Sequence, residues 1–496
     1  MKIAENFKTP FKGTTRVYAL TDSHQETRKT SAFLSKILDN EKENKNVLFL
    51  NGGDMFKGIY PRPLERDIYI KTKKAKPDME MVTTIGNNDF GFNNIQLSFL
   101  KETIKTFSDN GIHTVCANVF KENGEPLDNV KPYIIVERDG DKNFITGFCI
   151  NNINVKKEGI IAKPQEEILD EIIEAIKKEK PRNVIILNHD HITSSDKIME
   201  YCTQAGISVS LLVGGHEHDF IPHKKDSKIY YPQAFSNIMY KMDLVSDGKK
   251  CDIKNVEMIK NENLGLNKIF EEEIVNFEAE TGLLDNVVPS VLNLTRHYEK
   301  TCPLGSFLAD EMKKVANADI AFFSTGFLST GLPYKKDGYI TNYTLSKALS
   351  APTPIKKVEF NADELKAIFQ RALDVHTYKK ANPRFLQLSS NIKLEGRGVD
   401  SAQRFILEQI YINNEPLLDN NGDAKDKNKT YTCAIDSFLS EGGQGYEIIA
   451  KKPSEIIFKN EEPTKINKIL LDALQEAENK YQKGSEYPYA EIAEVK

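Results

Sequence analysis

Short apolar runs alternate with amphipathic stretches over residues 1–260. Residues 30–44, 92–110 and 164–179 place apolar side chains at helical spacing, as helices that cover a sheet do. The runs between these stretches have the length of buried strands, and they are Val17–Leu20, Val47–Leu50, Val82–Ile85, Val184–Leu187 and Leu211–Val213. The alternation predicts an α/β domain. It does not separate one doubly wound sheet from a two-sheet sandwich flanked by helices.

A second set of elements follows a charged segment at residues 268–278. Its apolar positions 269, 270, 274, 275 and 277 fit one helical face, so the segment is predicted to be a connecting helix. Beyond it we expect strands at 318–323, 357–360 and 431–435, helices at 364–373 and 463–481, and a polar loop at 414–430. The predicted domains are residues 1–265 and 285–496, joined by a connector at 266–284.

The composition excludes some classes of protein but does not indicate a reaction. The chain has 496 residues, 40% hydrophobic and 28% charged, with a formal net charge of −5 and no dominant basic block. This balance argues against a nucleic-acid polymer as partner, and no apolar run is long enough to insert in a membrane. Residues 1–20 lack the apolar core of a signal peptide. We therefore expect a cytoplasmic protein, or a periplasmic or secreted one from which a leader was removed. Six cysteines without CxxC spacing are expected to be reduced thiols.

Potential metal ligands follow or end each apolar run of the first domain. The carboxyl ends of successive strands meet at one edge of a sheet, so these side chains are expected to converge. Oxygen and nitrogen ligands without thiolate suit Mn, Zn, Fe, Co or Ni rather than Ca. A single Gly-Asp or Asn-His pair is more often a turn, but here several such motifs occur in sequence. The seven candidates are Asp22, His24, Asp54, Asn87, His189, His216 and His218.

The order of these motifs resembles the calcineurin-like metallophosphoesterases. In the second half, the segments Leu304–Asp310, Ala318–Ala321, Phe385–Ser389 and Phe438–Tyr446 resemble the 5'-nucleotidase/UDP-sugar hydrolase family. The resemblance implies a calcineurin-like β-sandwich flanked by helices, followed by an α/β domain of 5'-nucleotidase type that binds substrate. It also implies a small nucleotide-like phosphoester as substrate, with the protein acting as a monomer or weak dimer.

The resemblance also implies how the ligands divide between two divalent metal ions. One ion would be held by Asp22, His24, Asp54 and His218, and the other by Asp54, Asn87, His189 and His216. The metals would bind a phosphoryl group and lower the pKa of a bridging water, so that a metal-bridging hydroxide attacks a phosphomonoester or phosphodiester in line.

The chain departs from the family at its catalytic dyad. The family motif Gly-Asn-His-Glu-Phe-Asp is replaced by residues 86–91, in which Asn88 stands for the His and Gly91 for the Asp. Asparagine donates a hydrogen bond but delivers no proton, and loss of a positioned acid costs about 10²–10⁴ in rate. Asn88 is expected to contact a phosphoryl oxygen. His191, two residues from His189, is the best candidate for a substitute, although it also fits an ordinary surface-loop histidine.

The second domain departs from the family as well. The Asn-Ser-Gly-Gly-x-Arg segment is replaced by Ser324–Ser329 without an arginine, the Pro-Phe-Gly-Asn segment by residues 351–354, and its glycine-rich loop carries Gln444 instead of Asp. Phe438 remains where a base-stacking aromatic stands, worth roughly 1–3 kcal/mol in stacking, or else it is a core residue. A less anionic ligand than AMP would fit this altered pocket.

Three functions remain open on the sequence. The first is a two-metal phosphoesterase of 5'-nucleotidase type with altered specificity and low turnover. The second is a weak or inactive homologue that keeps its metals to bind a ligand. The third is a metal-dependent hydrolase of a non-phosphorus ester, against which inhibition by phosphate or vanadate would count.

Overall fold

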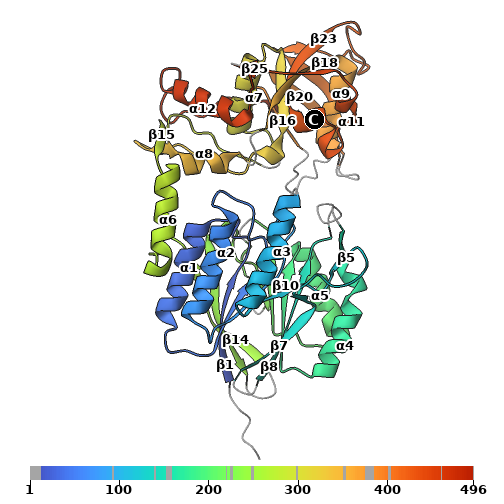
Figure 1. The fold of residues 1–496 in the computed structure, drawn as a ribbon. Helices are drawn as coiled ribbons and strands as arrows, with labels where there is room; N and C mark the ends of the chain where they lie inside the picture. The colour runs from blue at the N-terminus through green and yellow to red at the C-terminus, as the bar shows by residue number, and fades with distance from the viewer. Residues whose placement is uncertain are drawn as a thin grey trace, which may run out of the picture. The chain divides into compact units, whose positions relative to one another are not determined.

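The structure, a computed structural model, divides into two compact units at Phe277 and Glu278, within helix α6 (Lys268–Thr281) (Figure 1). It describes residues 13–91, 94–138, 141–151, 159–218, 221–223, 227–246, 251–297, 300–349, 353–374, 385–399, 404–459 and 461–494. We call the part up to Phe277 unit 1 and the rest unit 2, and describe each by itself. No helix of the described ranges is both long and apolar enough to cross a membrane.

The two larger sheets of unit 1 pack face to face. Alternate residues of the first strand, such as Val17 and Ala19, are buried in the same cluster as Ile185 and Leu187 of the other sheet. This period-2 burial is what a sandwich requires, so the structure decides between the two architectures left open by the sequence. The seven-stranded sheet has the order β14 (Cys251–Lys260), β13 (Ile238–Ser246), β1 (Gly13–Leu20), β2 (Val47–Asn51), β3 (Glu80–Thr83), β4 (Ile112–Val115) and β6 (Val130–Lys131). The five-stranded sheet has the order β12 (Ile229–Tyr230), β11 (Leu211–Gly215), β10 (Asn183–His189), β8 (Asp141–Cys149) and β7 (Tyr133–Arg138).

Helices cover the outer faces of the sandwich. Tyr69 of α2 packs its ring against Phe49 of β2 and Phe107 of α3, while α4 and α5 bury residues such as Ile172 and Ile198 on the five-stranded sheet. The helices are α1 (Thr27–Asn40), α2 (Arg62–Ala75), α3 (Asn94–Asp109), α4 (Leu169–Glu179) and α5 (Ile192–Gln204). The predicted helix at 30–44 starts and ends earlier, as α1, and the one at 164–179 begins with a 3₁₀ turn at Gln165–Glu167. Helices α2 and α5 were not predicted.

The strand arrangement sets the position of the candidate ligands. Strands β1, β2 and β3 run parallel, as do β10 and β11. The carboxyl ends of parallel strands lie at the same edge of their sheet, so the loops after these strands meet at one rim.

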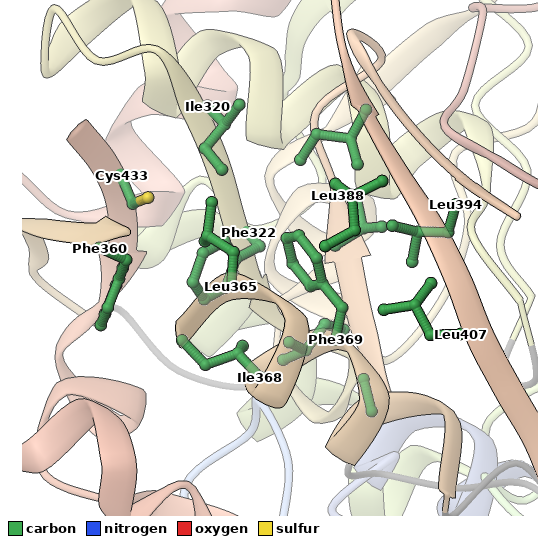
Figure 2. Close-up of a cluster of buried hydrophobic side chains, with 14 of the residues drawn as sticks. Ile320, Phe322, Phe360, Leu365, Ile368, Phe369, Leu388, Leu394, Leu407 and Cys433 are labelled. Carbon is green, nitrogen blue, oxygen red and sulfur yellow. The ribbon is translucent and has the colours of Figure 1, made fainter. Parts of the chain in front are cut away.

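Unit 2 is built on two further sheets that share a core with helix α9 (Ala362–Asp374) (Figure 2). Leu365, Ile368 and Phe369 of α9 lie in one apolar cluster with Leu388 and Leu407, which belong to different sheets. The other face of the larger sheet packs against α7 (Pro303–Val315) and α12 (Ile466–Ala477). The sheets have the orders β19 (Leu386–Leu388), β16 (Ile320–Ser324), β23 (Thr430–Asp436), β18 (Ile355–Asn361), β24 (Ser454–Ile456), and β22 (Glu415–Pro416), β21 (Arg404–Ile412), β20 (Ile392–Val399), β27 (Glu491–Glu494). The strands predicted at 318–323, 357–360 and 431–435 are therefore confirmed as β16, β18 and β23.

Candidate active site

Four of the seven candidate ligands form a compact cluster at the rim of the sandwich. Asp22 and His24 follow β1, Asp54 follows β2 and His218 follows β11, and each offers a ligand atom within 4.8 Å of the others. The Nε2 atoms of His24 and His218 are 3.0 Å apart. Two carboxylates and two imidazoles at this spacing form a donor set suited to one divalent transition metal.

The other three candidates lie next to this cluster. His189 ends β10, and its Nε2 is 3.2 Å from Oδ2 of Asp54. Nδ1 of His216 is 3.0 Å from Oδ1 of Asn87, and the backbone N–H of His216 donates to Asp22 Oδ2 at 3.0 Å. Asp54 Oδ2 is therefore close to both groups of donors, 3.2 Å from His189 Nε2 and 4.0 Å from His24 Nε2, and a carboxylate with two oxygens can contact two cations.

The backbone around these ligands is strained. Asp22, His24, Asp54 and His216 all have φ between 47° and 75°, in the left-handed region that costs a non-glycine residue free energy. Such strain is concentrated at functional sites, because the surrounding structure must hold it. Gly53 meets a similar demand without strain at φ 93°, and a Cβ there would lie 2.7 Å from the backbone N of Gly86.

Buried polar groups orient the ligands. The carbonyl of Gly52 accepts a hydrogen bond from His189 Nδ1 at 2.8 Å, which leaves Nε2 directed at the cluster. The buried carboxylate of Asp89 accepts backbone N–H bonds from Asp54, Phe56 and Gly86 at 2.8–3.0 Å and ties the loops after β2 and β3 together. Asp89 was not predicted as a supporting residue, although it lies two residues from Asn87 in the motif at residues 86–91.

Two further supporting residues were missed because they lie far away in the sequence. Glu65 accepts a hydrogen bond at 2.8 Å from Ser23, which stands between two ligands. The ring of Phe235 lies 5.1 Å from that of His24 and 5.2 Å from that of His218, and its backbone N–H donates to the Asp22 carbonyl at 2.7 Å. Phe235 has φ 61°, an outlier for a bulky residue, so its position is also held under strain.

The buried carboxylates of the cluster favour a positive charge beside them. Burial raises the pKa of Asp22 to about 7. Burial also opposes the charge of Asp54, but His189, His24 and the hydrogen bond from Asn88 hold the pKa of Asp54 below its usual range. Against the effect of burial, the two carboxylates raise the pKa of His189 to about 10. A proton on His189 thus balances buried negative charge in the protein alone.

The donor set fits divalent cations. A cation would replace the proton on His189 as the balancing charge, since ligands bind metals in the deprotonated form. Burial lowers the pKa of His216 to about 3, so that this imidazole is neutral and ready to coordinate. His189 Nε2 is buried, and its carboxylate neighbour is Asp54 Oδ2 at 3.2 Å, so a cation held by Asp54 would be within reach of this nitrogen.

The two departures at the dyad have visible consequences. The Asn88 backbone N–H donates to Asp54 Oδ1 at 2.7 Å and its side-chain amide donates to Oδ2. Asn88 therefore donates hydrogen bonds to both carboxylate oxygens of Asp54. Gly91 has φ 72°, and a Cβ there would collide with Gln96, so an aspartate could not be restored at this position without strain.

His191 lies beside the cluster. Its ring centroid is 4.6 Å from that of His216, its Nδ1 is 3.2 Å from Oε1 of Glu217, and its side chain is 56% exposed. The structure thus brings His191 to the edge of the candidate centre with an open approach.

In unit 2 the candidate substrate residues lie at the carboxyl ends of β16 and β23. Phe438 is 42% exposed and packs edge to face on Phe327, with centroids 6.2 Å apart. Ser324 Oγ donates to Oε1 of Gln444 at 2.9 Å. An exposed aromatic ring that packs on a half-buried one beside an amide is a surface suited to a planar ligand. Of the replaced segment 351–354, residues 351 and 352 lie outside the described residues.

Each unit matches a known protein family. Residues 15–220 match the calcineurin-like phosphoesterase family and residues 280–451 match the 5'-nucleotidase C-terminal domain. An apyrase of Aedes albopictus is 23% identical over 494 residues, covering 87% of this chain and 83% of the relative.

Solved structures share the fold. A 5'-nucleotidase precursor of Thermus thermophilus superposes with a TM-score of 0.71 at 16% identity, covering 97% of this chain and 99% of that chain. A sulfate thiohydrolase of the same species superposes at 0.67 with 14% identity, covering 94% and 82%. The predicted fold class is confirmed: an α/β chain with a calcineurin-like sandwich followed by a 5'-nucleotidase-type domain.

Proposed function

The chain belongs to the calcineurin-like metallophosphoesterases of 5'-nucleotidase type, which are metal-dependent phosphoester hydrolases, and we propose that it hydrolyses a nucleotide-like phosphoester at a centre of two divalent cations. The observation that carries this proposal is the cluster of Asp22, His24, Asp54 and His218, whose ligand atoms lie within 4.8 Å of one another, with His189 Nε2 3.2 Å from Asp54 Oδ2.

The ligands would divide around Asp54. Asp22, His24 and His218 would hold one cation with Asp54, and Asn87, His189 and His216 would hold the other. Bound cations of the Mn, Zn, Fe, Co or Ni type supply Lewis-acid activation of the phosphoryl group and of the attacking water. The protein keeps these ligands in place through the Gly52 carbonyl, the Asp89 carboxylate and the strained loops described above.

Asn88 and His191 are the proposed polar contacts to the reacting group. Asn88 supports this role through its place next to Asp54, although its amide must turn from that carboxylate to reach a phosphoryl oxygen. His191 is supported by its 4.6 Å ring separation from His216 and its exposure. Asn88 delivers no proton, and the pair that His191 forms with Glu217 is exposed at the edge of the centre, so we expect turnover below that of a family member with an intact dyad.

The proposed substrate is a nucleotide because of unit 2. Phe438 presents an exposed ring next to Phe327, and Gln444 lies beside them on the loop after β23. The names of relatives point in the same direction, since apyrases and 5'-nucleotidases are among them.

The test is hydrolysis of bis-p-nitrophenyl phosphate, p-nitrophenyl phosphate and a nucleotide panel with added Mn²⁺, by the wild type and Asn88→His. Wild-type activity on any of these, abolished by EDTA and by Asp54→Ala, supports the proposal. Inactive wild type with active Asn88→His would show an intact centre that has lost its acid. If both are inactive while Mn²⁺ binds, the proposal is wrong.

A second candidate is a binding protein that keeps its metals without useful turnover. The observation that favours it is the Asn88 side chain, which is bonded to Asp54 in the place where the family has its acid. A hydrolase of a non-phosphorus ester is a third possibility, because a sulfate thiohydrolase shares the fold. Inhibition by vanadate would count against this third function.

A further inference from the structure

Unit 2 has an arginine beside its candidate substrate residues Phe438 and Gln444 that the family motifs do not indicate. Arg371 lies in the last turn of α9 (Ala362–Asp374). The chain enters α9 from β18, which runs antiparallel to β23, so the carboxyl end of the helix points back toward the carboxyl ends of β16 and β23. Arg371 is therefore at the same edge as Ser324 and Phe438.

The guanidinium of Arg371 covers a glycine of the pocket loop. Its Nη2 would collide with a Cβ on Gly445, and its Cζ is 3.4 Å from the position of that Cβ. Gly445 also has φ 84°, a conformation that favours glycine. The guanidinium of Arg371 therefore packs against the backbone of this turn.

Arg371 forms no structural ion pair with the described residues. Within the described part of the chain it makes no salt bridge or hydrogen bond, and its Nε is buried without a partner. A guanidinium carries five donors and stays charged, so its donors remain for an anion.

Three consecutive residues of one turn connect this cation to the aromatic pair. A Cβ on Gly443 would touch the ring of Phe438, Gln444 accepts a hydrogen bond from Ser324, and Gly445 lies under Arg371. The turn thus joins an exposed aromatic ring, an amide and a cation, which are the contacts that a base and a separate anionic group would need.

We propose that Arg371 is the anion-binding residue of this pocket, and that the pocket takes a nucleotide in preference to the corresponding nucleoside. The inference deepens the proposed function and rests on its substrate class, but not on turnover. It reverses the expectation from the sequence, in which the missing family arginine pointed to a less anionic ligand. Arg371 supplies the charge from another element.

The experiment is calorimetric titration of the full chain with ADP, AMP and adenosine in EDTA, so that binding is measured without metal or hydrolysis. The wild type should bind ADP more tightly than adenosine. Arg371→Gln should weaken ADP binding about 10- to 100-fold, as loss of a hydrogen-bonded charge does, and leave adenosine binding unchanged. Arg371→Lys should recover part of the loss. The matched control is Arg397→Gln, since Arg397 is 61% exposed and pairs with Glu408 on the smaller sheet.

The other role for Arg371 is to stabilise the carboxyl end of α9, where a cation is favourable. In that case Arg371→Gln would lower the unfolding temperature and leave the preference for ADP over adenosine intact. That result, or a wild type that binds adenosine as tightly as ADP, would overturn the inference. Mn²⁺ binding and hydrolysis, measured separately, report on the proposed function, so the two can fail independently.

Discussion

Glu65 gives a quantitative test of how the turn between two candidate ligands is held. Its carboxyl is fully buried and accepts hydrogen bonds from Ser23 at 2.8 Å and Thr27 at 2.7 Å. Burial outweighs these hydrogen bonds and raises the pKa of Glu65 from 4.5 to about 7. The neutral form is therefore the one that the folded protein prefers.

Thermodynamic linkage sets the sign and the size of the change in stability with pH. Because the folded pKa is raised, the contribution of Glu65 to stability is fully present below the unfolded pKa of 4.5 and is lost as the pH rises through about 7. Each pKa unit is worth about 1.4 kcal/mol, so ionisation should lower the free energy of unfolding by about 3 kcal/mol. Glu65→Gln removes the titration and keeps the shape and one acceptor oxygen.

The assay is urea unfolding of metal-free protein in EDTA from about pH 5 to about pH 8. The free energy of unfolding is measured for unit 1. The wild type should lose about 2.5 kcal/mol more than Glu65→Gln over this range. Glu257→Gln, at a side chain 54% exposed and paired with Lys241, is the control and should follow the wild type. Parallel pH profiles for wild type and Glu65→Gln would refute the reasoning that a buried, neutral carboxyl supports this turn.

Three other changes test the remaining parts of the structure. Asp54→Ala should abolish Mn²⁺ binding and hydrolysis together, and surviving activity would exclude the two-cation centre. Phe235→Gly relieves strain at φ 61° but removes the ring beside His24 and His218, so calorimetry should show Mn²⁺ affinity reduced on the order of 10-fold with little loss of stability; unchanged affinity would contradict this. Phe369→Ala, at a fully buried position, should destabilise unit 2 by about 3–5 kcal/mol in urea unfolding while Mn²⁺ binding is retained, and a loss below about 1 kcal/mol would contradict the core assignment.

The sequence by itself determined the fold class and the family. Short continuous apolar runs identified the strands that became β1, β2, β10 and β11, because strands buried on both faces need apolar residues at every position. The candidate ligands could be found because each directly follows or ends a strand, as Asp22 and His189 do. Their roles as ligands and the domain boundaries stay predictions.

Contacts between distant segments were decided only by the tertiary structure. The period of a strand does not say which strands pair, so only the structure selected a two-sheet sandwich. The clamp of Asn88 on Asp54, the ring of Phe235 beside two histidines and the guanidinium of Arg371 over Gly445 each join segments with no local signal for one another. Such contacts depend on register and packing summed over the whole unit, which a local pattern of residue types does not contain.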